Sequence, residues 1–567
     1  MRFLSPEGMR VVDRRTIEGG TSGGRLMAAA GRAVAEETWR AFPDPGLSVL
    51  ALCGTGHNGG DGFVAARELL GRYRRVRVAL AGEPAGLRGD ASAAAEDYRG
   101  AGGEVRRVRS AGELRGLLEH SDVLVDALLG TGVAGELRDL PRELLEAACG
   151  FAGGVVAVDA PSGLDLATGT LLGPVPRADL TVTFGAAKLG HVLGAGPDVS
   201  GRIVVRAIGL DADALADAAG APDSARALSF REAERLLPLP GRRAHKRDAG
   251  VVVVVAGSRA YSGAAVLACR GASLAGAGLV HALVPACLKS PLTAAHPEII
   301  AAALPEEADG SLGAGAERPL REALEKARPD AVVLGPGLGG ADGTRGLVRG
   351  LLRSLSAGEG AADGQTRSGA RAGGAGGPAL LLDADALNAF AGERHRIADA
   401  ARRTRLAMTP HPGELGRLLQ MPAREVDRRR VDLARQVAGE LGCAVLLKGV
   451  PTVVCGPDAR TLLNLTGNAA LARGGTGDLL SGIAGTFLAK GLQALDALGL
   501  GAFVQGLAGD LARARLGTLS ATAGEIARDL PRALRALERG STAALARRLG
   551  TSYAELLEEP PVNEDEG

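Results

Sequence analysis

Residues 47–62 of the chain read LSVLALCGTGHNGGDG, an apolar run that leads directly into a glycine-rich turn. The run predicts a buried strand. Gly54, Gly56 and Gly59 fit the pattern in which backbone N–H groups at a helix N-terminus approach a phosphate. Asp61 would repel a phosphate if it were exposed, so we expect it to cap the helix or to touch substrate. An ordinary tight turn between a strand and a helix is the alternative for this stretch.

The pattern around this turn continues through the first 210 residues. Short Val- and Leu-rich runs alternate there with helical patterns, and this order predicts βαβ units in a parallel, doubly wound sheet. The expected strands are 47–53, 75–81, 122–127, 154–159 and 179–184, and the expected helices include 62–71 and 138–149.

A second α/β pattern begins near residue 228. A five-valine strand at 250–256 precedes a helix of small residues at 262–277, and further buried strands are expected at 330–334, 379–382, 406–408 and 443–447. We therefore divide the chain into a first domain at 1–215, a linker at 216–227, a second domain at 228–535 and a tail at 536–567. Residues 354–378 are rich in Gly, Ala and Ser, which predicts a disordered surface insertion.

Composition excludes several classes of function. The 567 residues include 66 basic and 65 acidic side chains, so no basic field for nucleic acid or for a membrane surface is expected. The six cysteines are scattered singly, which indicates neither a disulfide framework nor a zinc site. No secretory signal or membrane span is visible, and the expected compartment is the cytoplasm. The chain contains six lysines, sixty arginines and five asparagines. A position that has a lysine or an asparagine is therefore expected to require that residue type.

Acidic residues follow two further strands of the first domain. Asp126 begins DALLGTG and Asp159 begins DAPSGLD, each at the carboxyl end of an expected strand. Ligands of open α/β sheets bind outside these strand ends, so Asn58, Asp126, Asp159 and Ser162 are expected in one crevice. Oxygen ligands of this kind suit a hard cation. A single acid at such a position is more often a helix cap.

Over residues 1–210 the sequence resembles the NAD(P)HX epimerase family, through GxGxNGGDG, DALLGTG, DAPSGLD and the stretch from Phe184 to Gly190 that contains Lys188. The resemblance implies a Rossmann-like fold, exchange between the epimers of hydrated NADH or NADPH, and a potassium ion held by Asn58, Asp126 and Ser162. Asp159 would be catalytic. The implied substrate contacts are His57, Asn58, Gly59, Gly60, Asp61, Gly130, Thr131, Gly132, Val133, Ala134, Gly135, Glu136 and Asp159. The chain departs from the family pattern at His57, where a second Asn is usual, and at Ala28-Ala29, where Glu-Asn is usual.

The most specific motif of the second domain is residues 467–482, GNAALARGGTGDLLSG. A glycine turn that opens a helix presents several N–H groups to an anion, and Asp478 stands at the helix start. Transfer of a phosphoryl group to a hydroxyl needs this combination, because the amides neutralise phosphate charge while the carboxylate orients or deprotonates the hydroxyl. A capped helix after a glycine turn is the alternative.

Four other stretches of the second domain stand at or near strand ends. Lys448 opens KGVPT and is expected at a nucleotide phosphate, and His411 in TPHPGE could contact substrate or simply stabilise a turn. GPGLG at 335–339 follows one strand. DADALN at 383–388 places two acids and an asparagine where they could position phosphate or Mg²⁺.

Over about residues 228–534 these motifs, in this order, resemble the ADP/ATP-dependent NAD(P)HX dehydratases, which have a ribokinase-like fold. The resemblance implies Mg²⁺ with ADP or ATP as cofactors and Asp478 as the catalytic base. The implied contacts with hydrated NAD(P)H are Ala264, Gly337, His411 and Asp478. The implied nucleotide contacts are Lys448, Gly449, Val450, Pro451, Thr452 and Gly477. Members of this family commonly form homo-oligomers.

The predicted function is therefore repair of hydrated NAD(P)H by an epimerase joined to a nucleotide-dependent dehydratase. A kinase for a small alcohol, such as a sugar or hydroxymethylpyrimidine, fused to a nucleotide-binding regulatory domain is the alternative. It shares the GGTGD motif but is less well matched by TPHPGE and KGxxT. A first domain that only binds or scaffolds is a third interpretation.

Overall fold

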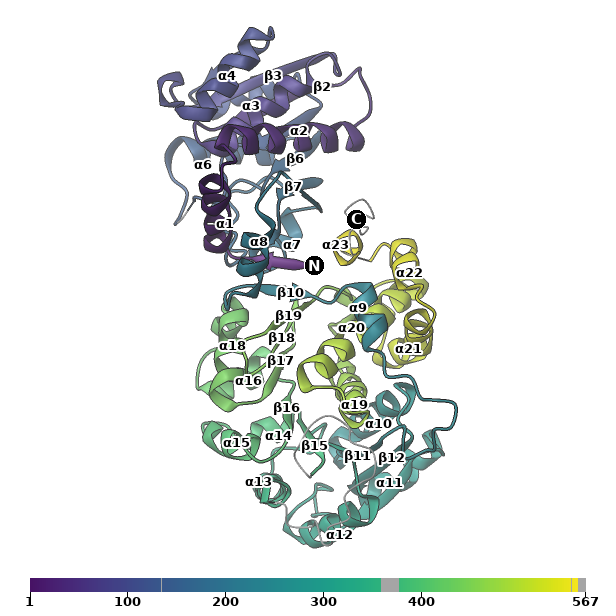
Figure 1. Ribbon diagram of the computed structural model, residues 1–567. Coiled ribbons are helices and arrows are strands. Elements are labelled where there is room, and N and C mark those ends of the chain that lie inside the picture. Colours follow the sequence, from purple (N-terminus) through teal and green to yellow (C-terminus); the bar gives the residue numbers. More distant parts are fainter. Residues whose placement is uncertain (134, 358–376, 552, 559–567) are drawn as a thin grey trace. The chain divides into compact units, whose positions relative to one another are not determined.

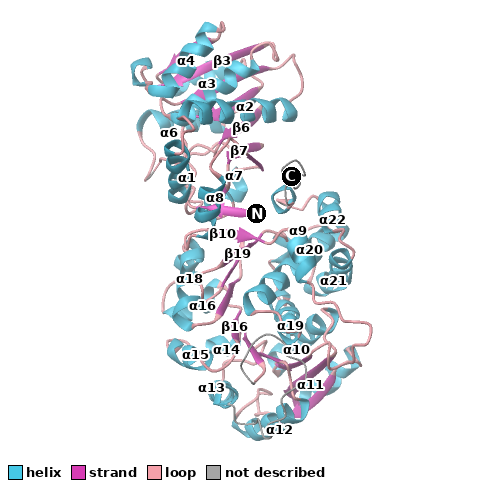
Figure 2. Cartoon of the chain, in the orientation of Figure 1, coloured by secondary structure: helices cyan, strands magenta, loops and turns pink. Residues whose placement is uncertain are grey.

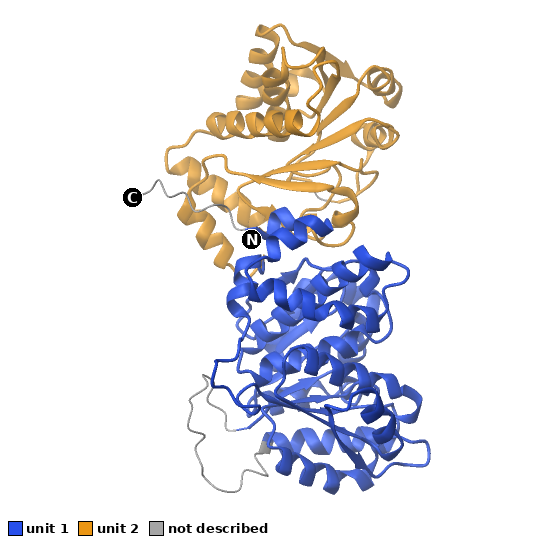
Figure 3. Cartoon of the chain, turned by 90° about the vertical axis from the view of Figure 1, so that its right-hand side faces the viewer, with its two compact units in different colours: residues 1, 227–567 blue, residues 2–226 orange. Residues whose placement is uncertain are grey.

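The computed structural model of the chain describes residues 1–133, 135–357, 377–551 and 553–558. Helices and strands alternate along the chain (Figure 2). The chain divides into two compact units, Arg2–Arg226 and Ala227–Gly567 with Met1 (Figure 3). Ala134, most of the expected insertion and the end of the expected tail lie outside the described residues.

The N-terminal unit contains a seven-stranded, all-parallel sheet in the order β4-β3-β2-β5-β6-β7-β9. This is the doubly wound sheet that the strand and helix pattern predicts. Its strands are β2 (Ser48–Cys53), β3 (Arg75–Ala81), β4 (Glu104–Val108), β5 (Val123–Ala127), β6 (Gly154–Val158), β7 (Leu180–Phe184) and β9 (Arg202–Arg206).

Helices cover both faces of this sheet, because neighbouring residues of each strand point to opposite faces. Val49 and Ala51 of β2 pack with α2, α3 and α4, whereas Leu50 and Leu52 pack with α5 and α6. The helices are α1 (Pro6–Glu18), α2 (Gly23–Ala41), α3 (His57–Leu69), α4 (Gly89–Gly100), α5 (Ala111–Leu118), α6 (Asp139–Cys149), α7 (Gly196–Val199) and α8 (Ala212–Gly220), with short 3₁₀ turns at Pro84–Gly86 and Leu189–His191.

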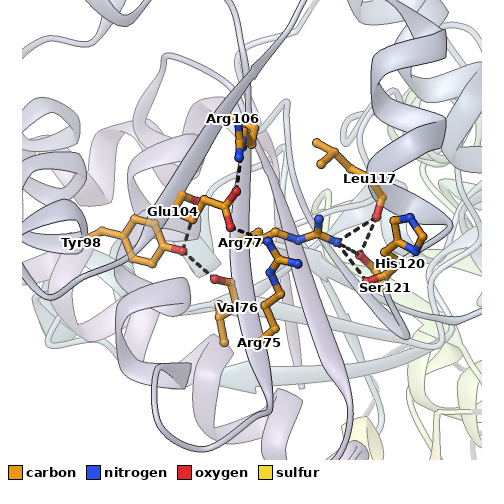
Figure 4. A network of polar contacts seen from close by, with 9 residues as sticks. All are labelled: Arg75, Val76, Arg77, Tyr98, Glu104, Arg106, Leu117, His120 and Ser121. Atoms are coloured by element: carbon orange, nitrogen blue, oxygen red, sulfur yellow. Dashed lines mark hydrogen bonds and ion pairs between the residues drawn. The ribbon is translucent and has the colours of Figure 1, made fainter.

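A buried cation ties β3 to the end of α5 (Figure 4). Arg77 donates to the carbonyl oxygens of Leu117 and His120, at 3.1 and 2.9 Å, and to Ser121 Oγ at 3.2 Å. Burial lowers the pKa of Arg77. The guanidinium thus satisfies carbonyls at a helix C-terminus, where positive charge is favourable.

The segment expected to be a linker, 216–227, is ordered instead. It contains the end of α8 and the strand β10 (Ala225–Ala227), which pairs antiparallel with β1 (Arg2–Leu4); β1 also pairs with β8 (Ala187–Lys188). Ala214 and Ala218 of α8 are buried against Leu4, Met9 and Val12. Ala214 and Ala218 therefore form part of an apolar face of α8.

The C-terminal unit contains a sheet in the order β13-β12-β11-β14-β15-β16-β17-β18-β19. Neighbours from β13 to β17 are parallel, and β18 is antiparallel to both β17 and β19. The strands are β11 (Val251–Val255), β12 (Leu279–Pro285), β13 (Ile300–Leu304), β14 (Ala331–Leu334), β15 (Ala379–Leu382), β16 (Leu406–Met408), β17 (Ala444–Leu447), β18 (Thr452–Cys455) and β19 (Thr461–Asn464).

Small residues let helices α10 and α19 of this unit pack closely. A Cβ added to Gly482 would lie 1.9 Å from the carbonyl oxygen of Ala268, so no larger residue fits there. Figure 1 shows α10, α19 and α20 on one side of the sheet and α15, α16 and α18 on the other. The helices are α9 (Phe230–Leu236), α10 (Ser262–Leu274), α11 (Ala286–Ala295), α12 (Glu317–Ala327), α13 (Asp342–Ala357), α14 (Asp385–Asn388), α15 (Arg394–Ala401), α16 (Pro412–Leu419), α17 (Ala423–Arg428), α18 (Arg430–Leu441), α19 (Thr476–Ala489), α20 (Ala494–Leu516), α21 (Ala523–Glu538), α22 (Thr542–Leu549) and α23 (Ala554–Leu557), with 3₁₀ turns at Arg259–Tyr261, Ala314–Ala316 and Ala469–Leu471.

No helix in the described part of the chain has both the length and the apolar character that a membrane span requires. All six cysteines are free thiols.

Candidate functional site

The glycine-rich turn after β2 leads directly into α3, so the residues from His57 to Asp61 form the start of that helix. A Cβ on Gly59 would lie 1.9 Å from the carbonyl oxygen of Gly54, which excludes any side chain at this position. Gly56 is the N-cap residue and makes no side-chain capping bond. The expectation that Asp61 caps the helix is therefore wrong, because Asp61 lies in its second turn.

The three residues expected to hold a cation meet around the backbone of Leu129. Asn58 Nδ2 donates to the Leu129 carbonyl oxygen at 2.9 Å, and the Leu129 N–H donates to Ser162 Oγ at 2.9 Å. Ser162 also donates to Asp126 twice, from Oγ to Oδ1 at 2.6 Å and from the backbone N–H to Oδ2 at 2.8 Å. Residues from α3 and from the ends of β5 and β6 thus form one cluster.

The chemistry of this cluster fits a hard cation. Its oxygen atoms come from carboxylate, hydroxyl and backbone carbonyl groups, and Asn58 presents its amide nitrogen, Nδ2, to the Leu129 carbonyl oxygen. Asp126 and Ser162 are each 1% exposed, and burial raises the pKa of Asp126, although the bonds from Ser162 partly offset this. Asp126 has no cationic side chain as an ion-pair partner among the described residues. A bound cation stabilises a buried carboxylate of this kind.

Asp159 forms a buried ion pair with Lys188. Lys188 Nζ donates to Asp159 Oδ1 at 2.5 Å and to Thr183 Oγ1 at 2.8 Å, and the Lys188 side chain is 2% exposed. Burial works against the charge of Asp159, but Lys188 outweighs it and holds the pKa of Asp159 below its ordinary value. Asp159 directly follows β6 with a φ of 63°, which is strained for a residue with a Cβ.

His191 fixes the backbone around this ion pair. The Lys188 N–H donates to His191 Nδ1 at 3.1 Å, so the neutral ring carries its proton on Nε2, which donates to the Asp159 carbonyl oxygen at 2.9 Å. Burial lowers the pKa of His191 to about 4. The ring is therefore neutral at physiological pH.

Two more carboxyl groups interact electrostatically with Asp159. Burial raises the pKa of Asp61 well above its ordinary value, and the negative charges of Asp159 and Asp13 raise it further. Burial also raises the pKa of Asp13, on α1, with Lys188 opposing and Asp159 adding to the effect. The site thus combines an ionised, lysine-bound aspartate with carboxyl groups that retain a proton more readily.

Two of the remaining expected substrate residues of this unit, Gly130 and His57, border the same region. A Cβ on Gly130 would lie 3.1 Å from Asn58 Cβ, so this loop contacts the start of α3. His57 is exposed, and it lowers the pKa of Asp13 through its charge. Glu136 is within 3.9 Å of Arg142. Ala134 lies outside the described residues.

In the C-terminal unit, α19 begins at the GGTGD turn. Its N-cap, Gly475, has a φ of 89°, a conformation that favours glycine. Asp478 lies in the first turn of the helix. Burial raises the pKa of Asp478 to about 6, and Asp383 adds to the rise while Lys448 opposes it. This value leaves the carboxyl able to accept a proton near neutral pH.

Lys448 reaches the same turn from the end of β17. Its Nζ donates to Asp383 Oδ1 at 2.5 Å, and a Cβ on Gly477 would lie 3.2 Å from that Nζ. Ser481 Oγ donates to the other oxygen of Asp383, also at 2.5 Å. Burial would lower the pKa of Lys448, but Asp383 and Glu414 raise it, so the side chain keeps its positive charge beside the turn.

Asp383 and Asp385 are the acids that the sequence predicts to position phosphate or Mg²⁺. Asp383 Oδ1 accepts from Lys448 Nζ, and Oδ2 accepts from Ser481 Oγ. Asp385 accepts from the Gly339 N–H at 2.8 Å and from Asn388 Nδ2 at 3.1 Å. Each acid therefore holds another part of the site in place.

The other expected contacts of this unit are positioned by loops after the strands. Gly337 has a φ of 62°, and a Cβ there would lie 2.6 Å from Ala264 Cβ, so these two residues adjoin. His411 is the N-cap of α16: its Nδ1 accepts from the Gly413 N–H at 3.0 Å, and Glu414 accepts from the His411 N–H at 2.8 Å. His411 thus has the turn-stabilising role, while its ring remains half exposed.

The KGVPT loop is built around a buried arginine. A Cβ on Gly449 would lie 2.3 Å from the guanidinium of Arg430, and Arg430 donates to the Pro451 carbonyl oxygen at 2.5 Å. Val450, between them, is 73% exposed. An apolar side chain is thus presented to solvent beside Lys448.

Two family models match the chain, NAD(P)H-hydrate dehydratase at residues 252–532 and YjeF-related protein N-terminus at residues 23–190. The bifunctional NAD(P)H-hydrate repair enzyme of Moorella thermoacetica is 36% identical over 530 residues, which cover 93% of this chain and 95% of that protein. The enzyme of the same name from Escherichia coli is 34% identical and covers 87% and 86%. The chain belongs to the family of bifunctional NAD(P)H-hydrate repair enzymes.

Solved structures resemble the C-terminal unit of this family member. The ADP/ATP-dependent NAD(P)H-hydrate dehydratase of Bacillus subtilis, co-crystallised with ATP and Mg²⁺, covers 55% of this chain and 99% of its own at 25% identity and a TM-score of 0.44. The hydroxyethylthiazole kinase of Pyrococcus horikoshii covers 53% and 92% at 17% identity and a TM-score of 0.34.

Several residues of the two sites in this repair-enzyme family member carried no recognisable pattern in the sequence. Asp13 lies in an amphipathic helix, next to Arg14. Asp383 and Ser481 lie in the motifs at 383–388 and 467–482, but they are 98 residues apart, so the sequence did not predict their contact. Thr183 and His191 flank Lys188 in sequence, so the rarity of lysine was the signal that could have led to them. The sequence alone named neither as a partner of Asp159.

Proposed function

We propose that the N-terminal unit interconverts the two epimers of hydrated NADH and NADPH, and that the C-terminal unit removes the water with ADP or ATP. The observation that carries the proposal is the Asp478 carboxyl group. It stands at a glycine turn that opens α19, has a pKa of about 6, and has the cationic Lys448 as a neighbour. A base beside a phosphate-binding turn is what transfer of a phosphoryl group to a hydroxyl requires.

In the dehydratase reaction, Asp478 takes the proton of the substrate hydroxyl. That oxygen attacks the terminal phosphorus of the nucleotide, so a new O–P bond forms as the bond to the departing AMP or ADP breaks. The carbon–oxygen bond then breaks and its electron pair leaves with phosphate, assisted by the lone pair of the ring nitrogen. Loss of a proton from the adjacent ring carbon restores the double bond of NAD(P)H.

The surrounding residues would hold the reactants for this step. Lys448 and the Gly477 N–H would bind the phosphates, and Val450 would contact the nucleotide base. Ala264, Gly337 and His411 would line the hydrated nicotinamide. Mg²⁺ would be held mainly by phosphate oxygens and water, next to Asp383 and Asp385, and it would neutralise charge on the transferred group.

In the epimerase reaction, a proton from Asp61 would let the ring hydroxyl leave as water, with the nitrogen lone pair forming a cationic C=N bond. The ionised Asp159, fixed by Lys188, would stabilise that cation. Water that returns to the opposite face of the ring restores the hydroxyl and releases one proton to solvent, and Asp61 regains its proton from solvent. No atom is gained or lost, as an isomerisation requires.

Asn58, Asp126 and Ser162 would hold the potassium ion. When bound, the ion supplies a positive charge that balances Asp126 and orders the loop after β5 next to the substrate. Residues 130–136 and the start of α3 would then contact the substrate from either side. We also propose that the enzyme acts in the cytoplasm as a homo-oligomer; its six free thiols agree with a reducing compartment.

The test is incubation of the protein with mixed epimers of hydrated NADH and with ADP or ATP in turn. We expect NADH absorbance to recover completely. Recovery that stops at the share of one epimer contradicts the epimerase activity, and no recovery with either nucleotide contradicts the dehydratase activity. A phosphorylated product that persists would instead indicate a kinase.

A further inference from the structure

The N-terminal unit contains a cavity that the proposed mechanism does not use. It has a volume of about 450 Å³ and lies between helix α2 and the segment that follows β9. Its lining residues are Thr21, Arg25, Ala28, Ala29, Arg32, Ile208 and Gly209.

The two walls of this cavity are fixed to their surroundings. Arg206, at the end of β9, forms an ion pair with Glu36 of α2 at 2.6 Å and a second with Glu37. A few residues later, the Asp211 N–H donates to Thr16 Oγ1 of α1 at 3.0 Å. Because the segment 206–211 is held at both ends, the cavity is part of the folded unit.

The charges that line the cavity are all positive. Arg25 and Arg32 are its two charged residues, and neither guanidinium forms an ion pair or hydrogen bond with any residue that the structure describes. The nearest acids of α2, Glu36 and Glu37, are committed to Arg206 and Arg40. Asp90 lies against Gly23 and Gly24 at the start of α2 and pairs with neither arginine.

The spacing of the two arginines suits one shared anion. They are seven residues apart, so they lie two turns apart on the same side of α2, at about 10 Å along the helix. Ala28 and Ala29 lie between them and also line the cavity, and their short side chains leave room for a ligand. Arg25 is in the first turn of α2, which contains no acidic residue, so the helix N-terminus adds to the positive potential.

We propose that this cavity binds a phosphate group of the dinucleotide substrate, held between Arg25 and Arg32. The proposal rests on the epimerase function proposed above and identifies where part of its substrate is bound. Arginine pairs with phosphate through two parallel N–H···O bonds, which gives both affinity and orientation. Two phosphates could supply the anion: the diphosphate bridge of both substrates, or the 2′-phosphate that only hydrated NADPH carries.

The test compares epimer exchange, without added nucleotide, in the wild-type chain and in Arg25→Gln/Arg32→Gln. Arg99→Gln/Arg115→Gln is the control, because it removes the same charge from exposed positions on α4 and α5. We expect the KM of the first variant to rise about tenfold or more, with kcat nearly unchanged. A rise with both substrates identifies the diphosphate, and a rise with hydrated NADPH alone identifies the 2′-phosphate. Unchanged KM values for both substrates overturn the proposal.

A second measurement separates this proposal from the epimerase function. Inorganic pyrophosphate is titrated into the three proteins by calorimetry. We expect the wild-type chain and the control to bind it at a site that the Arg25→Gln/Arg32→Gln variant lacks. One outcome separates the two proposals: the wild-type chain does not exchange epimers but binds pyrophosphate at a site that the variant lacks. The epimerase proposal then fails and the anion site stands. Identical isotherms for the three proteins overturn the anion site.

Discussion

Both units place a lysine against an aspartate at the carboxyl edge of a parallel sheet, yet the two ion pairs differ in what surrounds them. In each pair Nζ and Oδ1 are 2.5 Å apart. Lys188 is 2% exposed and also bonds to Thr183, whereas Lys448 is 20% exposed and adjoins the glycine turn of α19. Lys188 is thus the more enclosed lysine, although Asp159 itself is 12% exposed, and Lys448 is the lysine that a ligand can reach.

The backbone beside the two pairs is similar. Asp159 directly follows β6 with a φ of 63°, and Ala384 follows Asp383 at the end of β15 with a φ of 48°. Such conformations are costly for residues with a Cβ and persist where the surrounding structure holds them. In the N-terminal unit the paired acid is itself the proposed catalytic group. In the C-terminal unit that role belongs to a third residue, Asp478, while Asp383 only anchors the lysine.

The largest effect that tests this contrast is expected for Asp478→Asn. Removal of the proposed base should slow dehydration by a factor of about 10² to 10⁴ and leave epimer exchange unchanged. The two rates are measured separately, by recovery of NADH absorbance and by chromatography of the epimers. Asp458→Asn, in an exposed turn, is the control. Dehydration at the wild-type rate in Asp478→Asn would contradict the assignment of Asp478, and not Asp383, as the catalytic base.

The difference in exposure is tested by removing each lysine. Lys188→Met leaves Asp159 buried without its cation, and we expect a loss of unfolding free energy on the order of 3 kcal/mol in the N-terminal unit. Lys448→Met should cost its unit less, because Lys448 itself is 20% exposed; Asp383 is 1% exposed but keeps its hydrogen bond from Ser481 Oγ. Urea unfolding followed by fluorescence of Trp39, the single tryptophan, reports the N-terminal unit, and circular dichroism reports both.

The matched control for both lysine variants is Lys289→Met, which changes an exposed residue on α11. Its unfolding free energy should stay close to that of the wild-type chain. Equal losses for Lys188→Met and Lys448→Met would show that the exposure of the two pairs does not decide their stability.

Two residues, one in each unit, should contribute to stability in opposite directions as the pH falls. His191 has a folded pKa of about 4, below its ordinary value, so the unfolded chain binds more protons at this residue and His191 removes about 1.4 kcal/mol of stability per pH unit as the pH falls from 6.5 toward 4. Asp478 has a raised pKa of about 6, so the folded chain takes up its proton before the unfolded chain does. The contribution of Asp478 to stability therefore becomes more favourable as the pH falls from 6 toward 4. Comparison of wild-type protein with His191→Gln and with Asp478→Asn across this range isolates each contribution.

The same raised pKa predicts the pH dependence of catalysis. Dehydration should increase with pH up to about 6 and then level off, as Asp478 loses its proton and becomes a base. The rate of epimer exchange should not show this rise with pH. A dehydration rate that is independent of pH between 5 and 7 would argue against Asp478 as the base.

The smallest expected effect concerns the cation site. Ser162→Ala removes one of three proposed potassium ligands, so we expect a few-fold decrease in epimer exchange and a higher potassium concentration for half-maximal activity. Dehydration should be unaffected. Titration of KCl at constant ionic strength measures both, and an unchanged potassium response would exclude Ser162 as a ligand.

The sequence was sufficient for the fold class and for most strands. The run at 75–81 is β3 without any change of bounds, and the other expected strands agree with the structure to within one residue at each end. The reason is that buried parallel strands are short apolar runs between turn residues, which are visible locally. The helix and strand within 216–227 were not predicted, because alanines on one side of a helix do not differ in composition from those of a linker.

The sequence by itself also identified which strand ends carry chemistry, since parallel strands bring their carboxyl ends to one edge. Asn58, Asp126 and Ser162 could be grouped on that basis. Only the tertiary structure decided how the charges are paired: Asp159 with Lys188, and Asp383 with Lys448 and Ser481. It also showed that Arg25 and Arg32 line one cavity without an ion-pair partner among the described residues. Ion pairing and burial depend on distances between residues far apart in the chain, and no local pattern encodes those distances.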